Sequence, residues 1–553
     1  MSNIKNNSLW WLNEESMAML ERGYLLPNQT VEEKLHKICA RASEILGKPE
    51  LKDRFLEVFS KGWASLSSPI WANFGEDRGL PISCFSSYVD DSIDHIFSTI
   101  NDVAIMTKMG GGTAGDFSQI RPIGSEVSRG GKASGVLSFV EVFDSTIKNV
   151  SQSGVRKGGF AAYLDINHPE ILDFLRIKNR DSDMQSINTA VKVDDKFMEN
   201  MIKGDSEKRK VWAEVLKSRR EKGIPYLFFT DTANKYKPEV YKDKEMEIHH
   251  SNLCNEIYLP TNPEESLVCC LLSMNLYLYD EWKDTNSVEL MVYFLDAVMT
   301  DFIEKSEGIN GMERAVRFAK NHRAIGLGAL GFHSLLQNKN ISFESLEASY
   351  LNHEIFKNLK NKAYKASEEL AKEYGEPEVL KGYGRRNTTL LAIAPTTSSA
   401  SILGQVSPSV EPYKSNYYTV NLAKGSFERM NKPLSKLLKS KGKDTKEVWD
   451  SIVFNQGSVQ HLDFLSDHEK DVFKTFSEIN PEIIIRLASQ RQKYIDQGQS
   501  VNLMIPNEVS PKELNRLHIL AWESDLKGLY YQRGTSVTKE QMAKLMECNS
   551  CSA

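Results

Sequence analysis

The chain has 553 residues, of which 41% are apolar and 26% charged, and its 69 basic and 74 acidic side chains leave a net charge of −5. This length accommodates several ordinary domains or one large catalytic domain. The charge balance gives no support for nucleic-acid binding. No apolar run is long enough to cross a bilayer, and no signal-peptide core follows the first residues. We therefore expect no membrane association and a cytoplasmic location, which is the host cytoplasm if a virus encodes the chain.

The first part of the chain is expected to be helical. Apolar residues recur at three- and four-residue spacing over 31–46 and 51–63, so residues 1–67 are predicted to form an N-terminal helical region. After residue 68 short apolar runs alternate with amphipathic segments, a pattern typical of an α/β domain with many parallel strands. The last residues, 540–553, contain little that could anchor a core and predict a flexible tail. Expected strands include 161–164, 226–229 and 389–393, and expected helices include 169–177 and 345–374.

Two glycine-rich segments, 110–116 and 154–159, have the composition of loops that approach a phosphate or a base closely. Neither is a P-loop, because the Gly-Lys-Ser/Thr ending is missing. Arg121 follows the first segment and Arg156 lies in the second. The arginines favour nucleotide contact over plain flexible connections.

The pentad Asn-Leu-Cys-Asn-Glu at 252–256 carries three chemically active side chains. On an extended segment Asn252, Cys254 and Glu256 would share one face. A thiol, a proton acceptor and an amide around one small volume indicate sulfur chemistry. By itself the pentad is compatible with disulfide exchange and with acyl transfer.

Seven cysteines are too few for disulfides to stabilise so long a chain, and cytosolic thiols stay reduced unless turnover oxidises them. Only one Cys-x-x-Cys is present, without histidines at ligand spacing, so we expect no metal site. That motif, Cys548 with Cys551, predicts a mobile dithiol that reduces a buried disulfide by exchange. The other cysteines are Cys39, Cys84, Cys254, Cys269 and Cys270.

Three further motifs bear on function. Residues 326–331 match the Gly-x-Gly-x-x-Gly dinucleotide fingerprint, but no second strand with the required acidic residue follows, so we expect a tight helix–turn packing element instead of an NAD site. The hydroxyl-rich run at 394–401 follows an apolar strand and predicts a phosphate site at a helix start. The adjacent Tyr530 and Tyr531 could carry a radical or a hydrogen atom near a redox thiol.

From about residue 68 to the C-terminus the chain resembles the large (α) subunit of class I ribonucleotide reductase. The segment 251–257 is similar to the family's finger-loop motif, whose cysteine becomes a thiyl radical. Segments 81–85 and 268–276 are similar to those that hold the two redox cysteines. Counting back from the Asn-Leu pair at 275–276 assigns the second of these to Cys269, whereas a one-residue gap would shift the assignment to Cys270.

The resemblance implies a fold and a domain division. The expected fold is a ten-stranded α/β barrel, built from two five-stranded parallel half-sheets around a central finger loop. It would span residues 68–539 together with effector-binding loops, and residues 540–553 would form a flexible redox tail.

The resemblance also implies a mechanism. A metallocofactor in a separate radical-generating β subunit would supply a radical, which passes through Tyr531 and Tyr530 to Cys254. The Cys254 thiyl would take the ribose 3′ hydrogen while Glu256 accepts the 3′-hydroxyl proton and Asn252 holds the sugar hydroxyls. The implied activity is the reduction of ribonucleoside diphosphates to deoxyribonucleotides for DNA synthesis, with no cofactor bound in this chain.

In this scheme Cys84 and Cys269 supply the electrons and end as a disulfide. Cys548 and Cys551 would reduce that disulfide, and thioredoxin or glutaredoxin would restore the tail. The residues expected to contact the substrate are Ser68, Ser83, Gly112, Thr396, Thr397, Ser398 and Ser399.

An allosteric site for dNTP or ATP is implied at the interface of a homodimer. Asp91 and Ser92 would bind the effector with Arg121 nearby, and the loop around Arg156 would relay its identity to the substrate base. Many family members begin with an ATP-cone, whose motif is not found before residue 68. We therefore expect that dATP does not switch the enzyme off, while the choice of substrate stays regulated.

Three other readings compete with this one. A class II reductase uses adenosylcobalamin and has no use for the Tyr530–Tyr531 pair. A glycyl-radical enzyme would carry a C-terminal Arg-Val-x-Gly-Tyr-like loop, which is not found. A non-catalytic nucleotide-binding paralogue would not be expected to keep five cysteines and both tyrosines at the matching positions.

Overall fold

The computed structural model describes residues 9–128, 130–152, 156–179, 183–422, 425–506 and 508–534. The predicted redox tail, with Cys548 and Cys551, lies outside these residues and stays a prediction. No helix within the described ranges is both long and apolar enough to span a bilayer.

The chain begins with three helices, as the spacing of its apolar residues predicts: α1 (Glu14–Glu21), α2 (Val31–Ile45) and α3 (Leu51–Ser60). Thr30 and Glu33 form a capping box at the start of α2, which satisfies two backbone N–H groups there. A short strand, β1 (Ala64–Leu66), lies inside the predicted helical region and pairs antiparallel with β9 (Leu267–Asn275). The N-terminal region is therefore joined to the main sheet before the boundary expected at residue 67.

The first half of the barrel consists of five parallel strands in the order β2, β3, β6, β7, β8. Their side chains are almost entirely buried, as expected for parallel strands covered on both faces. The strands are β2 (Cys84–Tyr88), β3 (Thr113–Asp116), β6 (Phe160–Asp165), β7 (Ile187–Val193) and β8 (Tyr226–Phe229), and the connecting helices are α4 (Ser68–Asn73), α5 (Ile93–Lys108), α6 (Val136–Asn149), α7 (Ile171–Phe174), α8 (Asp195–Lys203) and α9 (Ser206–Lys222). Helix α7 is shorter than the predicted 169–177.

The second half continues from β9 through β10 (Ile325–Leu330), the segments 389–393 and 498–505, and the segment 528–534. Parallel bridges Leu327↔Leu391 and Ile393↔Gln499 link the middle segments. The two halves meet in antiparallel pairs, β2 with β9 and β8 with β14 (Gly528–Leu529). The predicted barrel of two five-stranded parallel halves is thus confirmed. Its remaining strands are β13 (Leu503–Ile505) and β15 (Gln532–Gly534).

The glycine fingerprint at 326–331 does not form the expected helix–turn element, because it lies in barrel strand β10 and the turn that follows. A Cβ on Gly326 would lie 2.4 Å from Leu271 Cδ2, and one on Gly328 would lie 2.7 Å from the Ala392 carbonyl oxygen. Close packing between neighbouring strands therefore explains these glycines.

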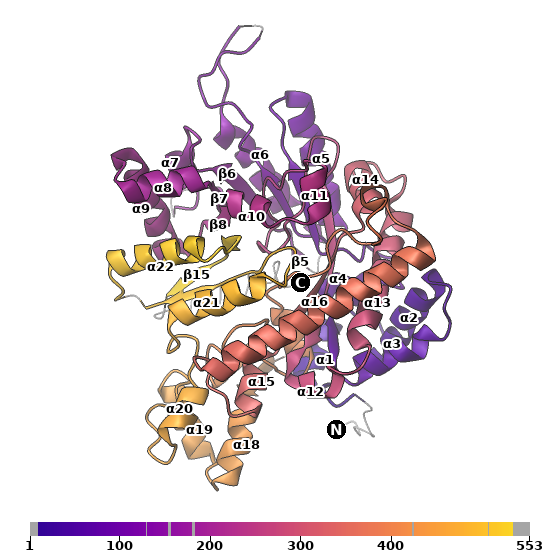
Figure 1. The fold of residues 1–553 in the computed structure, drawn as a ribbon, viewed down its shortest axis with the longest axis vertical. Helices are drawn as coiled ribbons and strands as arrows, with labels where there is room; N and C mark the ends of the chain where they lie inside the picture. Colours follow the sequence, from indigo (N-terminus) through magenta and orange to yellow (C-terminus); the bar gives the residue numbers. More distant parts are fainter. Residues whose placement is uncertain are drawn as a thin grey trace.

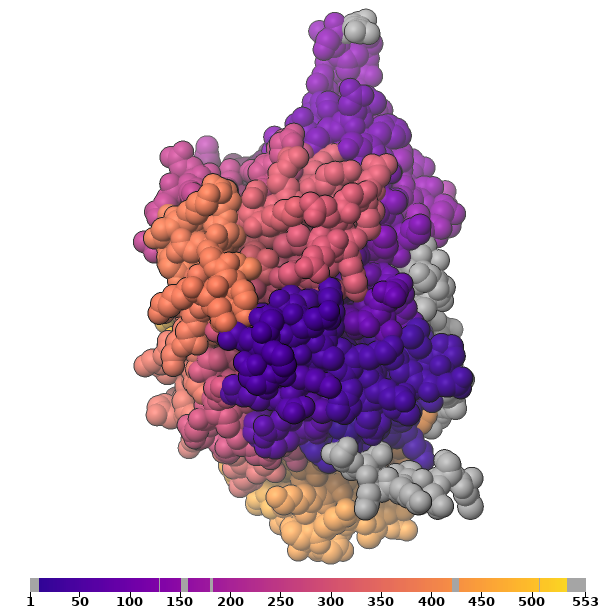
Figure 2. All heavy atoms as spheres, turned by 90° about the vertical axis from the view of Figure 1, so that its right-hand side faces the viewer, coloured from indigo at the N-terminus to yellow at the C-terminus, as the bar shows by residue number. Residues whose placement is uncertain are grey.

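Helices surround the barrel, and the long α16 (Leu346–Tyr374) crosses it diagonally (Figure 1). A small lobe at the bottom of that view has its own apolar cluster, between β11 (Tyr417–Leu422), β12 (Gly425–Met430), α18 (Lys432–Ser440), α19 (Lys446–Phe454) and α20 (Asp467–Val472). At the opposite end the segment between β3 and α6 projects from the body (Figure 2). The other elements are β4 (Ser151–Gln152), β5 (Arg156–Lys157), α10 (Thr230–Lys235), α11 (Glu239–Asp243), α12 (Tyr279–Trp282), α13 (Ser287–Ser306), α14 (Glu313–His322), α15 (Phe332–Asn338), α17 (Thr397–Ile402), α21 (Pro481–Gln492), α22 (Pro511–Glu523) and the 3₁₀ turns Leu276–Leu278 and Glu378–Leu380.

Candidate active site

The pentad at 252–256 lies on a buried loop inside the barrel, which we call the finger loop (249–257). It is not the extended segment that the sequence suggested. The Asn255 N–H donates to the Asn252 carbonyl at 3.2 Å, and Asn255 has a φ of 62°. A tight turn with one left-handed residue therefore brings Asn252, Cys254 and Glu256 into one volume.

Side chains from several barrel segments hold this turn. The Asn252 Oδ1 accepts the Glu256 N–H at 3.0 Å, and Tyr163 of β6 donates its hydroxyl to the Asn252 carbonyl at 2.7 Å. Ser500 donates to the Cys254 carbonyl at 2.5 Å and to Glu256 Oε2 at 3.2 Å. The loop is therefore anchored at both its amide and its carboxylate.

Cys84 and Cys269 lie directly opposite each other in the antiparallel pair β2–β9. Such partners have Cα atoms roughly 4.5–5.5 Å apart, within the range that a disulfide spans. Asn252 Nδ2 donates to Cys84 Sγ at 3.1 Å, and the Cys84 thiol lies 4.0 Å from Glu256 Oε1. The barrel thus brings this cysteine pair to the finger loop.

Cys270 points away from this pair, because successive side chains of a strand face opposite sides. Its thiol donates to the Leu295 carbonyl of α13 at 3.5 Å. Cys269 Sγ instead accepts from Gln497 Nε2 at 3.7 Å. This geometry supports Cys269 over Cys270 as the partner of Cys84.

Glu256 is the carboxylate of the site, and its environment suits a general base. Burial raises the pKa of Glu256 to about 7, while hydrogen bonds from Asn252, from backbone and from Ser500 partly oppose the rise. A base with a pKa near the working pH combines availability with proton affinity.

The pKa of Glu256 predicts a pH dependence. The carboxyl is protonated below pH 7 and ionised above it, so the kcat/KM of a reaction in which Glu256 is the base should rise with pH through about 7. Glu256→Gln should lower the rate by about 10²-fold or more and abolish this acid limb. Rates between about pH 5.5 and pH 8.5 test both expectations, and an unchanged acid limb in the variant would assign it to another group.

Tyr530 and Tyr531 lie between β14 and β15, with ring centroids 4.4 Å apart. Tyr226 of β8 contacts both rings, at 4.6 and 5.1 Å. Their buried cluster also contains Leu253 and Cys254 of the finger loop. The predicted tyrosine pair and the predicted radical cysteine thus share one interior cluster.

The predicted substrate residues lie around the same interior. Ser83 is buried, and its hydroxyl has no hydrogen-bond partner among the described residues. Gly112 lies against the finger loop, since a Cβ there would be 2.9 Å from Leu253 Cδ2. Ser68 shares a hydrogen bond of 2.8 Å with the Tyr24 hydroxyl.

The hydroxyl run at 396–399 is partly engaged within the fold. Thr396 Oγ1 accepts the Ser409 N–H at 2.6 Å, and Ser399 donates to the Leu66 carbonyl at 3.2 Å, close to Ser68. Thr397 is exposed and Ser398 is buried. The run begins α17, so its first N–H groups remain suited to an anion.

Three predicted effector residues come together outside the barrel. Arg121 Nε pairs with Asp91 Oδ2 at 2.6 Å, and Ser92 caps α5 by accepting the His95 N–H. The backbone of Arg156 pairs with Gln152 in the β4–β5 ladder, and its side chain lies outside the described part of the structure.

Sequence reasoning missed four residues that shape the site: Tyr163, Tyr226, Gln497 and Ser500. None lies in a motif, because each acts through a contact between segments far apart in the chain. The only local signal was the placement of Tyr163 and Tyr226 in predicted strands.

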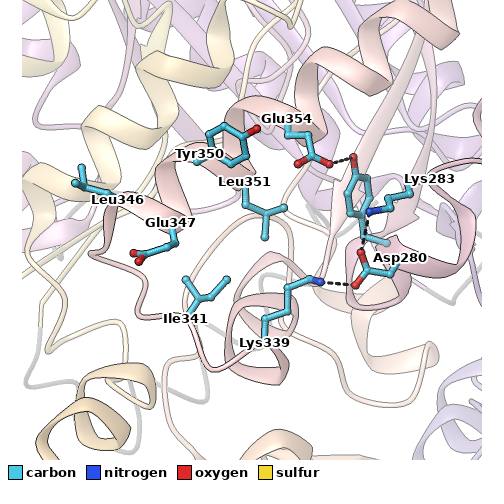
Figure 3. A pocket seen from close by; sticks show the side chains of 10 residues that line it. Asp280, Lys283, Lys339, Ile341, Leu346, Glu347, Tyr350, Leu351 and Glu354 are labelled. Atoms are coloured by element: carbon cyan, nitrogen blue, oxygen red, sulfur yellow. Dashed lines mark hydrogen bonds and ion pairs between the residues drawn. The ribbon is translucent and has the colours of Figure 1, made fainter.

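A surface pocket of about 450 Å³ lies elsewhere, between α12 and the start of α16 (Figure 3). Most of its charged groups are engaged in the fold: Asp280 pairs with Lys283 and Lys339, and Glu354 accepts from the Tyr279 hydroxyl. It contains none of the predicted site residues. Among the described residues no cluster of His, Cys, Asp and Glu could hold a metal ion.

Comparisons with known proteins agree with this arrangement. A family model described as "Ribonucleotide reductase, barrel domain" matches residues 82–208, 203–380 and 377–532. The putative ribonucleoside-diphosphate reductase large subunit of Frog virus 3 is 39% identical over 533 residues, covering 91% of this chain and 93% of that protein. The corresponding large subunit of Invertebrate iridescent virus 3 is 32% identical and covers 88% of each chain.

A solved structure is also similar. The class Id ribonucleotide reductase alpha subunit of Actinobacillus ureae superposes with a TM-score of 0.92 at 51% identity, covering 96% of this chain and 99% of that one. The matches include both halves of the barrel and the finger loop. The chain therefore belongs to the ribonucleotide reductase family, as a large (α) subunit.

Proposed function

We propose that this chain is the catalytic subunit of a class I ribonucleoside-diphosphate reductase, which makes 2′-deoxyribonucleotides by radical chemistry at Cys254. The proposal rests mainly on one observation: the finger loop contacts the cysteine pair. Asn252 contacts Cys84 at 3.1 Å, and Cys84 lies opposite Cys269 in the neighbouring strand.

The proposed reaction gives each group of the site a separate role. The Cys254 thiyl takes the hydrogen atom from C3′ of the ribose, and Glu256 accepts the 3′-hydroxyl proton. The 2′-hydroxyl leaves as water with one proton from the cysteine pair, the other hydrogen of the pair goes to C2′, and Cys84 and Cys269 form a disulfide. Glu256 returns its proton to the 3′ oxygen. Cys254 finally returns its hydrogen atom to C3′, which restores the thiyl radical.

The proposed reaction needs a radical and reducing equivalents, and each of them comes from a partner protein. A separate β subunit with a metallocofactor supplies the radical, which enters through Tyr531. The tail cysteines Cys548 and Cys551 reduce the disulfide, and thioredoxin or glutaredoxin renews them. The cytoplasmic location stays a prediction from the sequence.

We also propose a homodimer with its interface beside the effector residues. Ile93 and Phe97 at the start of α5 and Ile123 in the projecting segment are 60%, 53% and 67% exposed. These apolar side chains adjoin Asp91 and Arg121, where a dNTP or ATP would bind. Exposed apolar groups at such a place are typical of a protein interface.

The test is CDP reduction by the purified chain, with and without a candidate β subunit. We expect dCDP only when β is present, and a loss of about 10²-fold or more in Tyr531→Phe, whose ring cannot lose a hydroxyl hydrogen. Full activity without β, or in Tyr531→Phe, would contradict the class I assignment. A requirement for adenosylcobalamin would support class II instead.

A further inference from the structure

Arg219 of α9 is a fully buried arginine that lies against the backbone of Tyr530. Its Nη1 donates to the Tyr530 carbonyl at 3.0 Å and to the Pro225 carbonyl, and its Nε donates to His518 Nε2 at 3.0 Å. Its Nη2 has no hydrogen-bond partner among the described residues. The guanidinium thus contacts the backbone of both segments that carry the three contacting rings.

The groups around Arg219 are neutral. His518 donates its Nδ1 hydrogen to the Leu514 carbonyl at 2.8 Å, which leaves Nε2 to accept from Arg219. Burial, and then Arg219, lowers the pKa of His518 to about 3. Burial lowers the pKa of Arg219 to about 9, so the guanidinium stays charged at neutral pH without a carboxylate partner among the described residues. Burying this cation costs free energy, which its hydrogen bonds to neutral acceptors offset only in part.

The position of Arg219 coincides with a break in the sheet. Strands β8 and β14 pair at Phe228↔Gly528 and Leu227↔Leu529, and the ladder ends before Tyr226 and Tyr530. Beyond this point the Tyr530 N–H donates to the Val501 carbonyl, and the Tyr530 carbonyl accepts from Arg219. Arg219 bridges the two segments where they separate to make room for the rings.

We propose that Arg219, oriented by neutral His518, is a positioning residue for the radical relay: it holds Tyr530 in contact with Tyr226 and Tyr531. The step that depends on it is the transfer of one hydrogen atom from the Tyr530 hydroxyl to the Tyr531 oxyl radical. One O–H bond breaks, another forms, and no external oxidant is needed. This inference rests on the proposed function.

A second buried arginine provides a matched control. Arg491 of α21 is also buried, and its pKa is also lowered to about 9 by burial. It donates to Gln499 Oε1 at 2.7 Å and to Asn352 Oδ1 at 2.8 Å. Neither of these hydrogen bonds, within the described part of the chain, reaches a relay tyrosine, so Arg491→Met removes a comparable cation and leaves the relay contacts intact.

The experiment uses the complex with β, CDP and effector, and compares Arg219→Met, Arg219→Lys and Arg491→Met. We expect Arg219→Met to lower kcat by about tenfold or more with the KM for CDP unchanged within about twofold, and without a loss of thermal stability. Arg219→Lys should restore only part of kcat, because one ammonium cannot reproduce the fork of the guanidinium. Arg491→Met should keep kcat within about twofold.

A radical trap locates the affected step. With 3-aminotyrosine in place of Tyr531, EPR should show the same rate of radical formation whether residue 219 is Arg or the variant Met. With the trap in place of Tyr530, formation should slow by about tenfold in Arg219→Met, or in Arg219→Lys if the former does not fold. Equal rates at Tyr530, or a matching loss in Arg491→Met, would overturn the role of Arg219. Absence of a radical at Tyr531 with Arg219 intact would instead refute the proposed function.

Discussion

Cys254→Ser should abolish CDP reduction, with a loss in rate of at least about 10⁴-fold. This loss corresponds to an increase of about 5.5 kcal/mol in the activation free energy. A tyrosyl radical can oxidise a thiol, whereas the stronger O–H bond of serine makes the same transfer unfavourable. The fold should be retained, because the substitution keeps the backbone carbonyl of residue 254, which accepts from Ser500. Activity and thermal melting of the same preparation check both parts.

The control for this variant is Cys39→Ser. Cys39 is fully buried in α2, far along the chain from the finger loop, and shares only the chemistry of the substitution. It should keep nearly full activity. Substantial dCDP formation by Cys254→Ser, or equal losses in both variants, would contradict a radical role for Cys254.

Cys269→Ser should lower multiple-turnover CDP reduction by about 10²-fold or more, because serine cannot form the disulfide with Cys84. The adjacent Cys270→Ser should keep activity within about twofold. Its hydroxyl can still donate to the Leu295 carbonyl, which the Cys270 thiol contacts now. Rates with excess thioredoxin measure the difference.

Cys269→Ser and Cys270→Ser are closely matched variants, because the two residues are neighbours in one strand. Both cysteines are fully buried in β9 and differ in the face of the strand that they occupy. A larger loss in Cys270→Ser than in Cys269→Ser would mean that the one-residue gap considered from the sequence is real, and that Cys270 carries the electrons.

Local patterns predicted much of the barrel. The apolar runs at 161–164 and 226–229 became β6 and β8, and the periodic segments became α2, α3 and α16. These elements obey their own periodicity, so they could be found without tertiary information. Strand β10 could not be predicted in this way, because glycine has no local preference for a strand. Its alternating glycines are explained by close contacts with Leu271 and Ala392, which lie far away in the sequence.

The contacts of the predicted site residues could not be derived from the sequence. Motif resemblance made Cys84, Cys254 and Cys269 the candidates, and the register of β2 against β9 places Cys269, and not Cys270, opposite Cys84. The turn at the finger loop was missed because Asn252 uses its own side chain to bind the backbone of Glu256. Such competition between side chain and backbone is not visible in residue alternation.

The most direct test of the account is a single turnover without external reductant. The chain is reduced, freed of reductant, and mixed with β, effector and CDP in a Cys548→Ser, Cys551→Ser background, and its disulfides are then mapped by mass spectrometry. The account predicts about one dCDP per active site and a peptide that links Cys84 to Cys269. Formation of dCDP with both of these cysteines still reduced, or with Cys270 linked instead, would contradict it.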